Sequence, residues 1–187
     1  MTIVTLDFPS RALHDVGLAA WFGGTLANAV GLNRAAAETD RYSEAGRVAN
    51  AGWDAWTPVN AAAIGAHLVG SVGQMVGNAG RVAAQQGVPA MTITKTALTV
   101  SALGVTAYAR LLGRKVAARP DVPVASGTEP TEATPPGVAK AQQQLKTLQW
   151  AVPALTAALI VVTAYAGEQQ RPSAVTAGVR KRMLSST

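Results

Sequence analysis

The sequence predicts an all-α integral membrane protein, a four-transmembrane-helix bundle with short extramembrane helices. Three observations predict this fold class. Charged residues make up 14% of the 187 residues, well below the roughly 25% that is usual in soluble domains. These charges avoid four long stretches of the chain. The third observation is that one of those stretches, residues 151–167, is apolar on every side of a helix.

The four uncharged stretches contain 18, 26, 14 and 21 residues, and they begin after Asp15, Asp54, Lys95 and Lys146. A bilayer core about 30 Å thick requires a helix of about 20 apolar residues, and a charge at its centre is costly. An alanine-rich soluble bundle is the alternative fold. A soluble helix carries a polar stripe opposite its apolar one, however, and residues 151–167 have none.

We expect one integral membrane domain over residues 1–187, with spans at residues 12–33, 58–79, 91–112 and 146–167. In the second span, Thr57 and Pro58 fit the N-cap and the first helical position. The third span is short between charges, but Lys95 and Arg110 at its ends are long enough to reach the headgroups.

Small residues predict close packing between the first two spans. Helices in lipid associate through van der Waals contacts that small side chains permit. We expect the helix-packing residues to be Ala19, Gly23, Ala27 and Gly31 in the first span, and Gly65, Gly70, Gly73 and Gly77 in the second.

Four aromatic residues lie where spans meet their loops, and they predict membrane-interface anchors. They are Trp53, Trp56, Tyr108 and Trp150. With four spans, all of them belong to the same face of the bilayer. The alternative is that the tryptophans are core residues of a soluble protein.

The segments outside the spans differ in character. Residues 34–50 have the charge spacing of a short surface helix. Five of the ten prolines lie in residues 117–137, which predicts a flexible linker. Residues 138–149 look helical and run on into the fourth span. The basic tail, residues 171–187, is expected to be mobile. The N-terminal segment has no pattern of a cleaved signal peptide, and the distribution of Lys and Arg leaves the orientation open.

His14, Asp15 and His67 are the candidate cofactor-binding residues, because an ionisable residue inside a membrane is a functional candidate. The predicted helix ends place the two histidines about 12 Å apart in depth across an antiparallel pair. That separation excludes one shared iron or copper. We therefore expect no cofactor and no metal site, and treat haem or copper as the alternative. Polar residues within the spans suit helix pairing or a transport path: Asn28, Asn60, Gln74 and Asn78.

The stretch HDVGLAAWFGG, residues 14–24, resembles the opening of the first helix in small bacterial membrane families, among them copper-resistance-D-like proteins. The matching residues are His14, Trp21, Gly23 and Gly24. The composition rich in Ala, Gly and Val is similar to that of small actinobacterial four-helix membrane proteins. That resemblance implies an accessory part of a membrane complex, with a respiratory complex as the candidate assembly.

No nucleophile, phosphate-binding or dinucleotide motif is present, and the chain has no cysteine. We therefore expect a multi-pass protein of the cell membrane that is an accessory or structural subunit and not an enzyme. Its expected partners are the lipid bilayer and the helices of other membrane proteins, and nucleic acid is not expected. The alternative function is a small haem-handling, metal-handling or transport protein that uses His14, Asp15 and His67.

Overall fold

The computed structural model describes residues 4–185, with the side chains of residues 8–184. Within this range the chain is all-α, as predicted, and its only strand-like pairing is an isolated bridge between Val124 and Pro130. Residues 1–3 and 186–187, the ends of the predicted domain and of the predicted tail, lie outside the described residues. The helices in chain order are α1 (Val4–Ala27), the π-helical turn η1 (Asn28–Leu32), α2 (Asn33–Ala37), α3 (Tyr42–Gly77), α4 (Ala79–Ala84), α5 (Val88–Ala117), α6 (Pro136–Glu168) and α7 (Pro172–Ser185).

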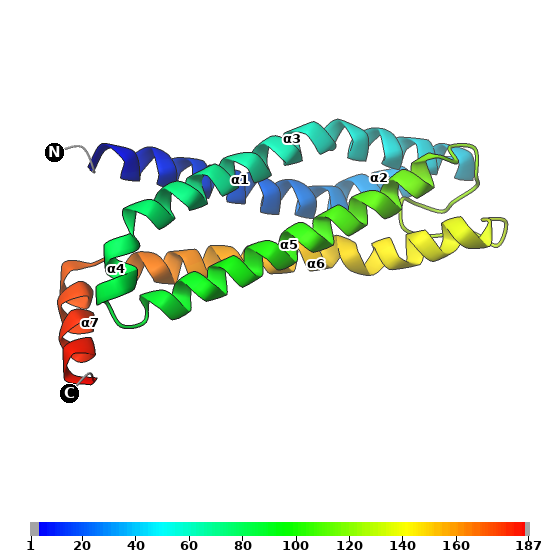
Figure 1. The fold of residues 1–187 in the computed structure, drawn as a ribbon. Helices are drawn as coiled ribbons and strands as arrows, with labels where there is room; N and C mark the ends of the chain where they lie inside the picture. The colour runs from blue at the N-terminus through cyan, green and yellow to red at the C-terminus, as the bar shows by residue number, and fades with distance from the viewer. Residues whose placement is uncertain (1–3, 186–187) are drawn as a thin grey trace.

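The long helices form two antiparallel pairs. Helix α1 runs along α3 on the upper side of Figure 1, and α5 runs along α6 on the lower side. The pairs are joined mainly by α1 against α6, whereas α3 and α5 touch at few points. We call the end with α4 and α7 the terminal end. The opposite end, with residues 38–41 and 118–135, is the loop end.

Three of the helices, α3, α5 and α6, are long and apolar enough to cross a membrane. In their most apolar windows only 17%, 11% and 22% of the residues are buried within the chain. Large apolar side chains such as Val72, Val100 and Val161 are more than half exposed. Exposed apolar surface on this scale is typical of a membrane or protein interface. The described residues 4–185 therefore contain three membrane-spanning candidates, and α1 is not among them.

The predicted helix start at Thr57 and Pro58 was wrong. Helix α3 begins at Tyr42 and continues through Pro58 without a break, so Thr57 is not an N-cap. The Thr57 hydroxyl instead donates to the carbonyl of Trp53 at 2.8 Å. Pro within a long helix is tolerated where neighbouring helices and hydroxyl side chains support the backbone. The expected surface helix at residues 34–50 is therefore α2 plus the first turns of α3.

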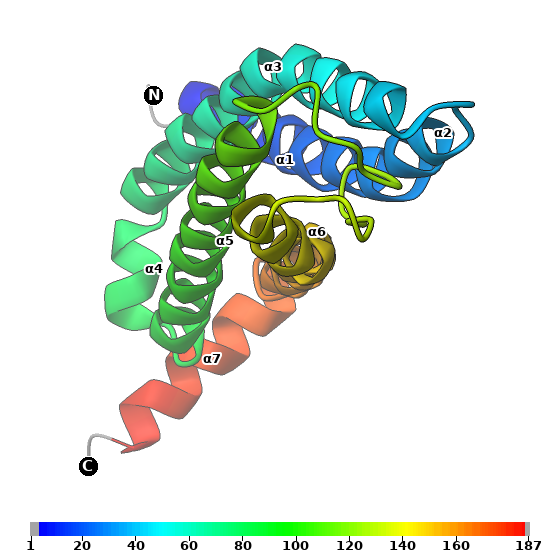
Figure 2. The same ribbon diagram turned by 90° about the vertical axis from the view of Figure 1, so that its right-hand side faces the viewer.

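The loop over residues 118–135 was expected to be flexible, but it packs across the loop end of the bundle (Figure 2). Val124, Ser126 and Thr128 are buried. The backbone N–H of Val124 donates to the carbonyl of Tyr42 at 3.1 Å, and the buried Gln142 amide donates to the carbonyl of Ser126 at 3.0 Å. These hydrogen bonds hold the proline-rich segment in place without regular secondary structure.

The basic tail is also more ordered than expected, because residues 172–185 form helix α7. Helix α7 packs against the turn between α4 and α5, where the N–H of Gln86 donates to the carbonyl of Gly178 at 3.4 Å. The continuation of residues 138–149 into the fourth span is confirmed, since both belong to α6.

Candidate functional site

The two histidines lie side by side in the interface between α1 and α3. The ring centroids of His14 and His67 are 4.4 Å apart, and the Trp21 ring lies 6.1 Å from His67. All three side chains are fully buried. The predicted separation of about 12 Å in depth was therefore wrong.

The error came from the predicted helix ends. The depth of His67 was counted from Pro58, but α3 begins at Tyr42. From His14 to the end of α2 at Ala37 the chain advances 23 residues, and from Tyr42 to His67 it advances 25. Because the two arms of this helical hairpin have nearly equal length, the histidines meet at the same level.

Hydrogen bonds fix the orientation of both rings. The Nδ1–H of His14 donates to Oδ1 of Asp15 at 2.7 Å, and the Nδ1–H of His67 donates to the carbonyl of His14 at 3.4 Å. A carboxylate and a carbonyl only accept hydrogen bonds, so each neutral ring carries its proton on Nδ1. Both Nε2 atoms are buried, and neither has a hydrogen-bond partner among the described residues. These residues contain no group of three or more His, Cys, Asp or Glu side chains able to hold a metal ion.

Glycines bring α1 and α3 close enough for the histidines to touch. A Cβ atom at Gly17 would collide with the backbone of Ala63 and His67, and one at Gly70 would collide with the backbone of Ser10 and His14. Gly70 and Gly73 were predicted to pack between these helices, and both face α1. Gly17, which was not predicted, makes the reciprocal contact.

The rest of the predicted ridge does not pack within the chain. Ala19, Gly23, Ala27 and Gly31 of the first span are exposed, and so is Gly77. A Cβ atom at Gly23, Gly31 or Gly65 would meet nothing within 4 Å. The prediction that these residues pair α1 with α3 was wrong, because small residues four apart occur on more than one face of so alanine-rich a helix.

The sequence carries a better signal that the prediction missed. The residues of α1 that meet α3 are Ser10, His14, Gly17, Trp21 and Gly24, spaced alternately by four and three. This spacing is the heptad pattern of knobs-into-holes packing. The mixed chemistry of its members hid the pattern from a search for small residues alone.

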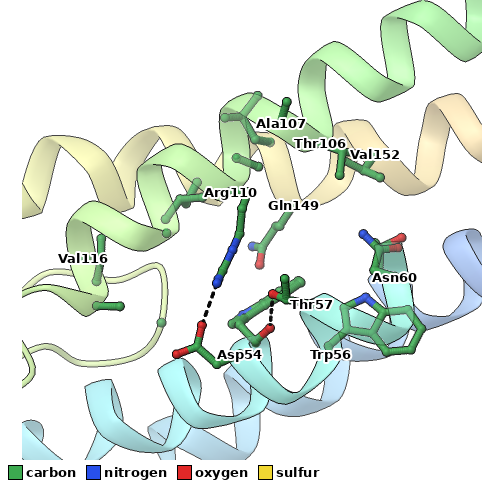
Figure 3. Close-up of a pocket in the computed structure, with 18 of the residues that line it drawn as sticks. Asp54, Trp56, Thr57, Asn60, Thr106, Ala107, Arg110, Val116, Gln149 and Val152 are labelled. Carbon is green, nitrogen blue, oxygen red and sulfur yellow. Dashed lines mark hydrogen bonds and ion pairs between the residues drawn. The ribbon is translucent and has the colours of Figure 1, made fainter. Parts of the chain in front are cut away.

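A cavity of about 370 Å³ lies near the loop end between α3, α5 and α6 (Figure 3). An ion pair crosses it, with Arg110 Nη2 2.9 Å from Asp54 Oδ1. Buried polar atoms of three lining residues have no partner among the described residues: Trp56 Nε1, Asn60 Oδ1 and Thr106 Oγ1.

Two of the four predicted anchors, Trp53 and Trp56, line this loop-end cavity. The indole of Trp53 donates to Asn33 Oδ1 at 3.2 Å, and Trp56 packs on Gly24. Tyr108 and Trp150 are about half exposed. Their role at a membrane interface stays a prediction.

A larger cavity of about 810 Å³ lies at the terminal end between the two helical pairs. Its charged lining residues are three cations, Arg11, Arg81 and Lys95, and one carboxylate, Asp15. The acceptors that Arg81 contacts among the described residues are neutral, and one of them is Gln85 Oε1 at 3.1 Å. Burial lowers the pKa of Arg81, and the charge of Arg11 lowers it further. Leu103 lines both cavities, so they lie end to end along the gap between α3 and α5.

No protein-family model, curated protein or solved structure matches the chain. The resemblance of residues 14–24 to copper-resistance-D-like proteins therefore stays a prediction.

Proposed function

We propose that the chain is a multi-pass protein of the cell membrane, with four spans, that serves as an accessory or structural subunit of a membrane complex without catalysis of its own. Helix α1, continued through η1 and α2, is the fourth span. Its uncharged residues 16–33 lie on one uninterrupted helical stretch. Since α1 packs along α3, it lies at the same depth in the bilayer as that membrane-spanning candidate.

The observation that carries the subunit role is the open side of the bundle. Helices α3 and α5 touch at few points, and apolar side chains on both of them are exposed there. The unused small-residue ridge on α1 provides a second surface of the kind that membrane helices pack against. We propose that helices of another membrane protein pack on the α1 ridge and on the outward apolar faces of α3 and α5, without entering the terminal-end cavity between those two helices. A respiratory complex is the candidate assembly that the composition suggests.

The membrane location is tested by alkaline carbonate extraction of membranes from cells that express the chain. We expect the protein to stay in the pellet, as four spans require. Release into the supernatant would contradict both the location and the subunit role.

The subunit role is tested by extraction into polymer nanodiscs, followed by affinity purification and identification of proteins present in stoichiometric amounts. The variant Gly23→Leu places a large side chain on the exposed α1 ridge, where nothing lies within 4 Å. We expect it to lose the partner while keeping the thermal stability of the wild type. Gly80→Leu is the matched control, because Gly80 also has no neighbour within 4 Å but lies on α4, outside the surfaces proposed to bind the partner. Recovery of a lone monomer, or equal retention by both variants, would contradict the role.

One observation favours a second candidate function, the binding of a metal ion by His14 and His67. Metal-ligating histidines usually donate their other N–H to a carboxylate or a backbone carbonyl, and these two histidines do both. Their Nε2 atoms face no other partner among the described residues. Neither cavity is lined by either histidine, which favours a bare ion over haem.

Copper or zinc loading of the purified protein, followed by desalting, metal analysis and a visible absorption spectrum, tests this candidate. We expect near-stoichiometric metal in the wild type and loss of it in His67→Ala, whereas Asn50→Ala retains it. Absence of retained metal, or equal retention in all three proteins, would contradict metal binding.

A further inference from the structure

The terminal-end cavity combines a cationic end with apolar walls. Leu68 and Val72 of α3, Val100 and Leu103 of α5, and Ile160 of α6 supply apolar surface. The cationic end contains Arg11, Arg81 and Lys95, with Asp15 as its one carboxylate. Its volume of about 810 Å³ is within the range of small-molecule sites, which is about 300–1,000 Å³. The shape and the charge together suit an amphiphile with an anionic head.

Lys95 is the central group of this cavity. It lies seven residues after the start of α5 at Val88, which is about 10 Å along the helix, and inside the predicted third span. Asp15 and Arg11 both interact electrostatically with Lys95, but no ion pair joins Lys95 to a carboxylate among the described residues. A lysine near the end of a span reaches the headgroup region, where anionic lipids attract it.

Two neutral groups of the lining are also without partners. Nε2 of Gln74 and Oγ1 of Thr163 are buried atoms with no hydrogen-bond partner among the described residues, and both residues line the cavity. An amide N–H and a hydroxyl are donors that suit the oxygen atoms of an anionic group. With Lys95 they form a set of donors contributed by three helices, α3, α5 and α6.

Part of the lining of this cavity is apolar and exposed. Val72, Met75 and Val100 line it, and these side chains are 59%, 54% and 61% exposed. In a bilayer this surface gives a lipid direct access to the cavity. This argument rests on the membrane location in the proposed function.

We propose that this cavity binds one anionic phospholipid, with its phosphodiester at Lys95, Gln74 and Thr163 and an acyl chain in the gap between α3 and α5. The headgroup then lies at the terminal edge of the bilayer, where lipid phosphates are found. The lipid phosphate then pairs with Lys95, which forms no ion pair with a carboxylate among the described residues.

Native mass spectrometry of the full-length protein in detergent, titrated with phosphatidylglycerol or phosphatidylcholine, tests the proposal. We expect one phosphatidylglycerol to bind the wild type at least tenfold more tightly than phosphatidylcholine does. Lys95→Gln is expected to weaken this binding by about tenfold or more, as the loss of a charge-assisted hydrogen bond predicts. Lys95→Arg keeps the charge and is expected to bind within a few-fold of the wild type.

Lys140→Gln is the matched control, because Lys140 is an exposed lysine of α6 far along the helix toward the loop end. Thr163→Val removes one donor with little change of shape, so it tests the site even if Lys95→Gln does not fold. We expect a several-fold loss of phosphatidylglycerol binding in Thr163→Val and none in Lys140→Gln.

Three results would overturn the proposal. The first is equal affinity for the two lipids. The second is equal binding of phosphatidylglycerol by the wild type, Lys95→Gln and Thr163→Val. The third is displacement of the lipid by millimolar inorganic phosphate, which would show that the site binds phosphate and does not require the rest of the lipid. Carbonate extraction tests the membrane location separately, so a failed lipid site and a failed location give different results.

Discussion

Helix α3 faces α1 on one side and α5 on the other, and the two interfaces differ in how closely the helices approach. Toward α1 it presents Gly70, Gly73 and His67, and the two backbones approach so closely that Cβ atoms would collide. Toward α5 it presents larger and more polar side chains, including Asn60, and two cavities remain. We call the first interface the closed seam and the second the open seam.

The comparison shows what holds helices together where water is absent. Burial of apolar surface gives little drive for association in lipid, so contact area has to come from close approach. Glycines provide that approach in the closed seam. The open seam has polar atoms without hydrogen-bond partners among the described residues, and it has exposed apolar side chains. Both kinds of group remain available for contact with another molecule. The closed seam therefore supplies stability, and the open seam is the surface that we propose for binding.

The largest expected effect comes from breaking the closed seam with Gly70→Leu. Its side chain would collide with the backbone of Ser10 and His14, which cannot move as a flexible side chain would. We expect a loss of at least about 3 kcal/mol, at the upper end of overpacking effects, measured as a fall in melting temperature and in monodisperse yield in detergent. Gly65→Leu is the control, because nothing lies within 4 Å of that position. Equal behaviour of the two variants would refute the closed seam.

The second prediction concerns Trp21, which connects the closed seam to the other helical pair. Trp21 is fully buried in a cluster with Ala63, Ala102 and Val152, so Trp21→Ala leaves a cavity where both pairs meet. We expect a loss of about 3–5 kcal/mol, measured by thermal or denaturant unfolding in detergent. Trp150→Ala, at a half-exposed tryptophan, is expected to stay within about 0.5 kcal/mol of the wild type. A similar loss in both variants would show that Trp21 is not a structural centre.

The third prediction tests the loop end, where hydrogen bonds replace close packing. Asn33 is buried, donates to Gln149 Oε1 at 2.6 Å and accepts from the Trp53 indole. Asn33→Ala leaves both partners unsatisfied, so we expect a loss of about 1–3 kcal/mol by the same unfolding assay. Asn50→Ala, at a partly buried asparagine of α3, should change stability by less than about 0.5 kcal/mol. A smaller loss in Asn33→Ala than in Asn50→Ala would contradict this role.

The smallest expected effect comes from the ion pair that crosses the open seam. Asp54 and Arg110 are both substantially exposed, and exposed pairs contribute about 0.2–1 kcal/mol. Asp54→Asn should therefore lower stability by less than about 1 kcal/mol, with no further loss in the double variant Asp54→Asn, Arg110→Gln. A loss comparable to that of Trp21→Ala would mean that the open seam is held together as firmly as the closed one.

The course of the helices could be predicted from the sequence because it depends on local chemistry. The uncharged segment after Asp54 lies in α3 except for its last three residues, and the one after Lys146 lies entirely in α6. Helix ends were less predictable. The local sequence around Pro58 is typical of a helix start, but α3 continues through it. Contacts with neighbouring helices support α3 there, and such contacts cannot be seen in the local sequence.

The sequence identified the residues of the candidate site but not their arrangement in space. His14, Asp15 and His67 were chosen because ionisable groups in apolar segments are unusual. The contact between the two histidines depends on the lengths of the two arms of the helical hairpin. The predicted start of the second helix, at Pro58, was about four turns too late, and this error separated the histidines in the prediction. The terminal-end cavity could not be predicted at all, since it arises from the spacing between whole helices.

The π-helical turn η1 has a consequence for how this chain tolerates changes in length. Residues Thr25, Ala29 and Asn33 are buried at intervals of four, and an i→i+5 turn keeps such residues nearer to one side than an α-helix does. Removal of one residue from Asn28–Leu32 would convert this wide turn to α-helix, and four α-helical residues cover about 400°, close to the rotation of five residues in a π-turn. Asn33 would then keep its direction toward Gln149. A single-codon deletion in this short stretch would therefore be absorbed, whereas the same deletion in the regular part of α1 would rotate everything after it by about 100°.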